Sequence, residues 1–225
     1  MNRRELAARF IIFQSHQLSL NGRNLTKKMN KKLLFSTPLF EFKNNDLAIK
    51  LKKHIATMNI DGVESKVAPQ IKHNISESKF DFFNSDIDVI KNARTYFATC
   101  LKNVLNDLRD SEDDYKIAFT DSWYHIGTKN SSHDLHAHIN CSWCGIFYIQ
   151  SGELNQGGQT FFCNPIFSNF LDLGTVHHND TEHIVTPEDG KLVLFPSYLK
   201  HFQSIYEGEE QRVVVAFNCT ILDKY

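Results

Sequence analysis

The fold is decided by residues 136–162, which read HAHINCSWCGIFYIQSGELNQGGQTFF. Short runs of aromatic and β-branched residues alternate here with turn-forming stretches such as SGELNQGG, a pattern typical of short antiparallel strands. The same pattern begins at Lys116 and continues through KIAFTDSWYHI, KLVLFP and RVVVAFNCTI. Residues 116–225 are therefore predicted to form an antiparallel sandwich or barrel.

Two segments before the predicted sheet have helical periodicity. Residues 45–58 place apolar side chains at one helical spacing, and Asn44 or Asn45 is the expected N-cap. Residues 86–108 repeat the pattern over a longer apolar stripe. We expect both helices to pack on the sheet, because each must bury its apolar face against another element. Residues 59–85 are expected to form a polar, irregular connection.

A pair of histidines opens the quoted stretch. His136 and His138 are separated by one residue, so on a strand their side chains share a face. His201 can complete a cap of three imidazoles on a divalent metal ion, which leaves positions open for a substrate. The alternative is a solvent-exposed pair of histidines without a metal. The flanking segments GGQTFF and GKLVLFPS, together with Arg212, favour the metal site.

Arg212 begins the predicted strand RVVVAFN. On a strand, alternate positions from Arg212 to Asn218 share one face, which carries Arg, Val, Ala and Asn. Small side chains with a charge at one end suit a cavity wall, whereas the intervening Val, Val and Phe suit a core. A buried guanidinium can bind the carboxylate of a cosubstrate through two donors. The alternative is a surface salt bridge.

These residues resemble the iron(II)- and 2-oxoglutarate-dependent oxygenases, which carry His-x-Asp or His-x-Glu, a distal His and then an Arg or Lys. The prolyl-hydroxylase branch has an aromatic strand and a Gly-Gly turn after the first ligands, and FYIQ (147–150) and GGQT (157–160) occupy those places here. A group of uncharacterised bacterial and phage oxygenases is more similar. It shares the element LFSTPLFEF (34–42), the His-x-His pair and the ending RVVVAFN (212–218). The resemblance covers residues 33–225.

The resemblance implies an α+β fold with a double-stranded β-helix, the jelly-roll core of cupins, backed by the N-terminal helices. The implied metal ligands are His136, His138 and His201, which would bind Fe(II), with 2-oxoglutarate and O2 as cosubstrates. By position, Arg212 and Tyr148 would bind the distal carboxylate of 2-oxoglutarate, and Asn218 its metal-chelating end. No catalytic residue is expected beyond the metal centre. The implied reaction hydroxylates an unactivated C–H bond and releases succinate and CO2.

His138 departs from the superfamily, because most members have a carboxylate at this position. Three imidazoles make the metal complex one charge more positive than two imidazoles and a carboxylate. Thiol dioxygenases use a three-histidine set without 2-oxoglutarate, so an enzyme of that type is one alternative. A non-catalytic jelly-roll module that binds a metal is the other. Asp134 lies before the first histidine, in the wrong order for the superfamily motif.

Cys141 and Cys144 form a Cys-x-x-Cys pair, a spacing that also occurs in zinc sites. Here the segment runs directly into a predicted strand, without the glycine turn that such a zinc clamp needs. We therefore expect two structural thiols.

The remaining histidines near the site are assigned no role in binding. His177, His178 and His183 are expected to be solvated in a long insert, residues 163–189, which with the earlier connection would shape the substrate pocket. His125 replaces an asparagine that is common in the more similar group. No contact to the cosubstrate is therefore assigned to it.

The composition is that of an ordinary globular protein. The 225 residues, 41% apolar and 23% charged, suit one domain. No apolar run approaches the roughly 20 residues of a membrane span. Five cysteines, an odd number, argue against a disulfide framework and for a reducing compartment. We expect a cytoplasmic enzyme with a small-molecule or peptide substrate, and the composition is compatible with a homo-oligomer.

The N-terminus is strongly basic. Residues 1–32 contain eight Lys and Arg against Glu5 alone, a net charge of +7, so the remaining residues carry −8. A basic arm could contact nucleic acid or an anionic membrane. The family-like sequence begins near residue 29, so we favour a disordered extension over 1–28 and expect neither partner. Residues 29–225 would then form a single oxygenase domain, with helical support over 29–115 and the jelly-roll core over 116–225.

Overall fold

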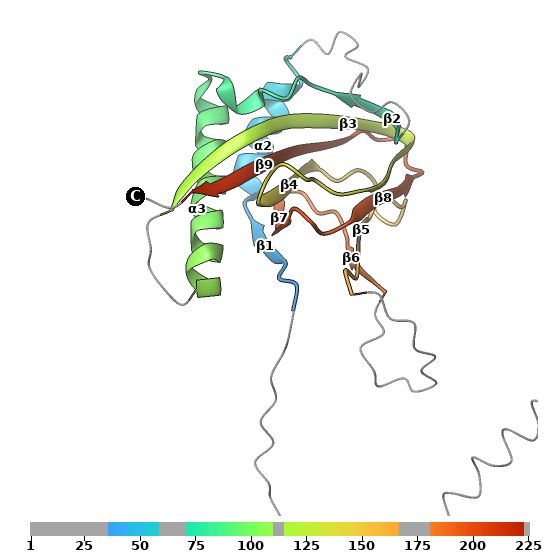
Figure 1. The fold of residues 1–225 in the computed structure, drawn as a ribbon. Coiled ribbons are helices and arrows are strands. Elements are labelled where there is room, and N and C mark those ends of the chain that lie inside the picture. Colours follow the sequence, from blue (N-terminus) through green and yellow to red (C-terminus); the bar gives the residue numbers. More distant parts are fainter. Residues whose placement is uncertain (1–35, 59–70, 110–114, 167–180, 223–225) are drawn as a thin grey trace, which may run out of the picture. The chain divides into compact units, whose positions relative to one another are not determined.

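The structure is a computed structural model, and it describes residues 36–58, 71–109, 115–166 and 181–222 (Figure 1). Within these residues the strands form one nine-stranded antiparallel sheet, in the order β1-β7-β4-β9-β3-β8-β5-β6, with β2 paired to β3. The strands are β1 (Phe40–Lys43), β2 (Lys72–Glu77), β3 (Lys116–His136), β4 (Trp143–Gln150), β5 (Thr160–Cys163), β6 (Glu182–Val185), β7 (Lys191–Pro196), β8 (His201–Tyr206) and β9 (Arg212–Leu222).

The long strand β3 belongs to both halves of this sheet. Residues 116–127 pair with β9, and residues 131–136 pair with β8. Register shifts in the β3–β8 pairing mark where the strand turns from one partner to the other. In Figure 1, β8, β5 and β6 lie on the side away from α3 (Asp88–Arg109). Side chains of the strands in both halves, among them Trp123 of β3 and Phe202 of β8, line one pocket.

The first helix, α2 (Asn45–Ile55), begins at the predicted residue and ends three residues before the predicted end at Met58. The side chain of Asn44 accepts a hydrogen bond from the backbone N–H of Leu47 at 3.0 Å, which caps the first turn. Asp46 lies in the first turn, and Lys52, Lys53 and His54 lie in the last, so both ends complement the helix dipole. Of the two expected caps, Asn44 is the one used.

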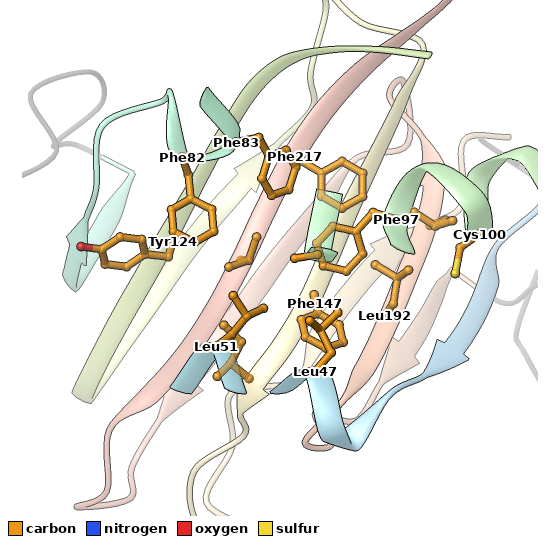
Figure 2. Packing of buried hydrophobic residues seen from close by; sticks show 14 of the residues in the cluster. Leu47, Leu51, Phe82, Phe83, Phe97, Cys100, Tyr124, Phe147, Leu192 and Phe217 are labelled. Atoms are coloured by element: carbon orange, nitrogen blue, oxygen red, sulfur yellow. The ribbon is translucent and has the colours of Figure 1, made fainter. Parts of the chain in front are cut away.

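The main hydrophobic core lies between the helices and the sheet, as Figure 2 shows. Leu51 of α2 and Phe97 of α3 are fully buried there. The ring of Phe97 stacks on Phe217 of β9, with 5.1 Å between centroids, and lies 5.2 Å from the ring of Phe147. Gly145 lets Phe217 approach β4 closely, because a Cβ at this position would lie 2.1 Å from the Phe217 ring.

A second, smaller core lies inside the sandwich. Its buried members come from β4, β5, β6, β7 and the turn after β7: Cys144, Tyr148, Phe162, Val185, Val193, Phe195 and Leu199. Strand β4 thus contributes to both cores, with Phe147 facing the helices and Tyr148 facing the interior of the sandwich. This division is the alternation that a strand buried on both faces requires.

The predicted jelly-roll core backed by helices is confirmed, and three details of the sequence prediction were wrong. The expected irregular connection contains strand β2 and a short 3-10 helix, η2 (Phe82–Asn84). The expected helical support contains β1, which pairs with β7. The runs KIAFTDSWYHI and HAHI were predicted as separate strands, whereas β3 is continuous to His136 and ends there.

Two further expectations concern the N-terminus and the membrane. The predicted basic extension, residues 1–28, lies outside the described residues. Among the described residues, none of the helices combines the length and the apolar character needed to cross a bilayer.

We predict that Phe97→Ala lowers the free energy of unfolding by about 3–5 kcal/mol, because it removes a fully buried ring and leaves a cavity between α3 and the sheet. Leu108→Ala on the same helix is the matched control. Leu108 is 45% exposed, and its removal should cost less than about 1 kcal/mol. Urea denaturation of both variants measures the difference. Equal effects would contradict the assignment of Phe97 as the residue that joins helix to sheet.

Candidate metal centre

Three histidines converge at the junction of β3 and β8. Each offers one nitrogen to a group in which all the ligand atoms lie within 4.8 Å of one another, and the members are His136, His138 and His201. His136 is the last residue of β3 and His201 the first of β8, and the two are directly paired in the sheet register. His138 lies just beyond the strand, where its backbone N–H donates to Ser197 O at 3.1 Å.

The origin of this convergence differs from the sequence prediction. His136 and His138 were expected to share a face of one strand, but β3 ends at His136 and His138 belongs to the segment that follows it. The pair that the sheet places together is instead His136 and His201, because they are opposite residues on neighbouring antiparallel strands. His138 joins them from the loop.

Two of the three imidazoles are fixed in the tautomer that a metal needs. The Nδ1 of His136 lies 2.8 Å from Asp134 O, and the Nδ1 of His201 lies 2.9 Å from Leu199 O. A carbonyl oxygen only accepts, so in both rings Nδ1 carries the proton and Nε2 keeps its lone pair. Metal-binding histidines commonly use their second nitrogen in this way, which orients the ring.

Burial keeps these imidazoles neutral. Desolvation, together with the charge that a neighbouring protonated histidine would carry, lowers the pKa of His138 to about 4 and that of His201 to about 3. The pKa of His136 is lowered as well, chiefly by desolvation. Three neutral imidazoles with available lone pairs are the donor set that a divalent transition metal accepts at neutral pH. The residues therefore fit a three-histidine metal site.

One pocket contains all six residues to which the resemblance assigns a role in binding the metal or the cosubstrate. The three histidines line it together with Arg212, Tyr148 and Asn218. As expected, the face of β9 that carries Arg212 and Asn218 forms a pocket wall, and Val213, Val215 and Phe217 lie in the main core.

Arg212 is buried in this pocket, with only 3% of its surface exposed. Its Nε donates to Ser151 O at 3.2 Å, and its guanidinium lies 5.5 Å from the centroid of the Tyr206 ring. Gly158 lies directly beside it, because a Cβ at this position would come within 2.9 Å of the guanidinium carbon. Among the described residues, no carboxylate forms an ion pair with Arg212. The alternative of a surface salt bridge is therefore not what the structure shows.

A buried cation without an anionic partner is costly unless a ligand supplies one. Burial lowers the pKa of Arg212, but a guanidinium still remains charged at neutral pH. Tyr148 lines the same pocket, fully buried, with its hydroxyl 2.7 Å from Thr160 Oγ1. Burial also raises the pKa of Tyr148, so its hydroxyl stays protonated and can donate. This corner of the pocket can therefore bind a carboxylate.

Asn218 and His125 line the pocket through other contacts. The Asn218 amide donates from Nδ2 to Asp121 Oδ2 at 3.3 Å, and its Oδ1 accepts from the Cys144 thiol at 3.4 Å. His125 is buried, and its Nε2 lies 2.7 Å from Trp123 Nε1 and 2.5 Å from Glu77 Oε1. These contacts hold His125 in the pocket wall.

Several site residues were not found from the sequence. Thr160, Gln203 and His133 all line the pocket. The ring of His133 stacks on His136 with 3.9 Å between centroids, and among the described residues its buried Nε2 has no hydrogen-bond partner. His133 lies three residues before His136, and on a regular strand residues at this spacing point to opposite faces. Only the register shifts of β3 bring the two rings together.

Predictions from the sequence also concern His177, His178, His183 and Asp134, of which His183 and Asp134 are described by the structure. His183 lies in β6 and is exposed, so the prediction of a loop was wrong and the prediction of solvation was right. His177 and His178 lie outside the described residues. The side chain of Asp134 is exposed and faces His73, 3.6 Å away, and is not part of the metal group.

Comparison with known proteins agrees with this site. Residues 121–218 match the family model described as "Putative 2OG-Fe(II) oxygenase". No curated protein matches the sequence.

Solved structures of low sequence identity share the fold. A prolyl-4-hydroxylase from Pseudomonas putida has a TM-score of 0.58 at 13% identity, over 82% of this chain and 94% of that one. HygX from Streptomyces hygroscopicus, solved with nickel and 2-oxoglutarate bound, has a TM-score of 0.56 at 13% identity, over 82% and 83%. The viral collagen prolyl hydroxylase from Paramecium Bursaria Chlorella virus-1 has a TM-score of 0.53 at 12% identity, over 80% and 94%.

The matched segment contains every histidine of the metal group and ends at Asn218. The resemblance stated from the sequence is thereby confirmed: in both its matched sequence and its fold, this chain is similar to the 2OG-Fe(II) oxygenases.

Proposed function

We propose that the protein is an Fe(II)- and 2-oxoglutarate-dependent dioxygenase that hydroxylates an unactivated C–H bond and releases succinate and CO2. The observation that carries the proposal is the pocket itself. It joins three neutral histidines to a buried Arg212 that has no carboxylate partner among the described residues. A ligand that chelates a metal at one end and has a carboxylate at the other matches both requirements, and 2-oxoglutarate is such a ligand.

His136, His138 and His201 would hold the iron through Nε2 of the first and third and one nitrogen of the second. When bound, Fe(II) supplies the activation of O2 that the reaction needs. The three ligands are neutral, so they leave the charge of the ion uncompensated. The protein would therefore favour a cosubstrate whose chelating end is anionic, which offsets the missing carboxylate ligand at position 138.

The other residues would bind and orient the cosubstrate. The guanidinium of Arg212 would form a charge-assisted pair with the distal carboxylate, and the Tyr148 hydroxyl, accepting from Thr160, would donate to the same group. Asn218 lies nearer the chelating end by position in β9, and its amide is held by Asp121. The apolar walls formed by Phe195, Val214 and other residues exclude water from the pocket.

The substrate would be a small molecule or a peptide. Both classes occur among the structural neighbours, since HygX was solved with hygromycin B bound and a prolyl hydroxylase from Trichoplax adhaerens with a peptide fragment. We propose a soluble, cytoplasmic enzyme, in agreement with its composition. Release of succinate, assayed against panels of peptides, amino acids, nucleotides and sugars, would identify the substrate class.

An anaerobic titration with Fe(II) and then 2-oxoglutarate tests the function directly. A weak visible charge-transfer band that requires both additions supports the proposal. Iron binding without any response to 2-oxoglutarate would favour the thiol-type dioxygenase, which the three-histidine set also suits. A protein that binds no iron would favour the non-catalytic module.

For the metal, we predict that His136→Ala or His201→Ala weakens Fe(II) binding by at least about 100-fold, because each variant removes one of three ligands. His138→Asp should still bind iron, since a carboxylate can replace the imidazole. Anaerobic calorimetry measures the affinities. His73→Ala is the matched control, because His73 is exposed and lies outside the group.

If the His136→Ala or His201→Ala variant bound Fe(II) with wild-type affinity, these histidines would not be metal ligands and the proposed metal site would be wrong. Unchanged affinity in His138→Ala would remove position 138 from the ligand set.

For the cosubstrate, we predict that Arg212→Ala raises the dissociation constant of 2-oxoglutarate by about 10²–10³, since breaking a buried ion pair costs roughly 3–5 kcal/mol. Arg212→Lys should restore part of the affinity, because an ammonium is a point charge and cannot reproduce the two-donor fork. The anaerobic charge-transfer titration measures both. Fe(II) affinity should stay near wild type.

Arg94→Ala is the control, because Arg94 lies on α3 against Phe119, away from the pocket. A normal response of Arg212→Ala to 2-oxoglutarate, or a loss of iron in that variant, would show that Arg212 has a structural role instead.

A further inference from the structure

Two cysteines lie beside the pocket and are not used by the proposed reaction. The sulfur atoms of Cys141 and Cys144 are 3.7 Å apart, and both thiols are free. Cys144 is buried and lines the pocket, whereas Cys141 is partly exposed on the segment between β3 and β4. That segment also carries His138. The pair therefore has one sulfur at the surface and one at the wall of the active site.

We propose that Cys141 and Cys144 form a reversible disulfide on exposure to a peroxide, and that this disulfide weakens metal binding at the adjacent site. Formation of the disulfide is inferred from the geometry of the two cysteines and does not depend on the proposed function. The effect of the disulfide on metal binding rests on the proposed function.

The pKa values of the two thiols are shifted in opposite directions, so one cysteine can attack the peroxide as a thiolate while the other keeps its proton. The Cys144 thiol can donate to the Cys141 sulfur, and this hydrogen bond lowers the pKa of Cys141, which favours its reactive thiolate. The same contact and burial raise the pKa of Cys144, so that thiol keeps its proton. The pKa values of the other three thiols, Cys100, Cys163 and Cys219, are all raised by burial. Cys141 is therefore the expected site of attack.

The oxidation balances with hydrogen peroxide as the only oxidant. The Cys141 thiolate attacks peroxide, the O–O bond breaks, hydroxide leaves and Cys141 becomes a sulfenic acid. The Cys144 sulfur, which gives up its proton, then attacks Cys141, so that the S–S bond forms and the oxygen leaves as water. Overall, two thiols lose two electrons and two protons, and one peroxide becomes two waters. A small-molecule thiol reverses the reaction by exchange.

Ser197 connects this pair to the metal ligands. Its hydroxyl donates to Cys141 O at 2.6 Å, and its own carbonyl accepts from the backbone N–H of His138 at 3.1 Å. Closing the disulfide shortens the distance between the two sulfur atoms from 3.7 Å to about 2.05 Å, and we infer that Cys141 moves towards Cys144 together with the 137–142 segment. The hydrogen bonds through Ser197 transmit that movement to His138.

A second contact also changes on oxidation. In the reduced protein the single S–H hydrogen of Cys144 can point either to the Cys141 sulfur or to Asn218 Oδ1, which lies 3.4 Å from the Cys144 sulfur. A disulfide sulfur has no hydrogen to donate, so Asn218 loses this partner. Both changes act on the same end of the pocket, where the metal and the chelating end of the cosubstrate would lie.

The test begins with mass spectrometry of the full chain. The reduced protein is treated with hydrogen peroxide, the peroxide is removed, and the remaining thiols are alkylated. We expect two fewer alkylated thiols in the wild type and in Cys163→Ser, the matched control, and no disulfide in Cys141→Ser. The Cys163 control also removes ambiguity from digestion, because no Lys or Arg lies between residues 130 and 190 and the tryptic peptide of the wild type contains all three cysteines.

In Cys144→Ser, Cys141 should stop at the sulfenic acid, which dimedone traps. A protein in which Cys141 and Cys144 both remain alkylatable, or in which Cys141 pairs with Cys219 or Cys163, would overturn the proposal.

The second measurement is metal affinity with Mn(II) as the probe, followed by electron paramagnetic resonance. Oxidation should weaken Mn(II) binding by about 10- to 100-fold, the effect typical of disturbing groups that orient metal ligands, and dithiothreitol should restore it. Peroxide-treated Cys141→Ser should bind Mn(II) like the reduced wild type. Unchanged affinity in the oxidised wild type, with the disulfide present, would overturn the coupling. Absence of Mn(II) binding in the reduced protein would instead refute the proposed metal centre, and alkylation would still decide the fate of the thiol pair.

Discussion

The pairing of β3 with two different partners is the constraint on which the site depends. Because its first part pairs with β9 and its last part with β8, one strand connects the wall that carries Arg212 to the strand that carries His201. The antiparallel register of β3 and β8 then places His136 directly opposite His201. The metal group is thus a consequence of backbone hydrogen bonding, and only His138 depends on a loop.

The electrostatics of the pocket follow from the same arrangement. Its titratable groups nearest the metal position are neutral because burial disfavours their protonated forms, whereas Arg212 keeps its charge because a guanidinium does not lose its proton at any ordinary pH. Within the described part of the chain, the guanidinium is held by the carbonyl oxygen of Ser151 and by the aromatic ring of Tyr206. The fold itself therefore holds a desolvated cation in place, and an anion that binds there gains a partner that is already positioned.

The sequence was sufficient for the features that depend on local periodicity and on spacing within one strand. The two helices and the alternation along β9 belong to this class, whereas the grouping of the histidines with Arg212 was expected from the family resemblance. The features that could not be predicted from the sequence depend on pairing between segments that are far apart in the chain. Strand β2 is short and polar and exists because β3 offers it an edge, and His133 reaches His136 only because β3 is bulged. The end of β3 at His136 likewise follows from the extent of its pairing with β8.

Strand β9 has the active site on one face and the main core on the other. Arg212, Val214 and Asn218 line the pocket, Val213 and Val215 pack in the main core, and Phe217 belongs to the core and also borders the pocket, so a wall one strand thick separates the two. Selection for thermal stability and selection for a new substrate would therefore act on neighbouring positions of the same strand. A substitution that repacks the core side of β9 would therefore also shift the side chains that line the pocket on its other face.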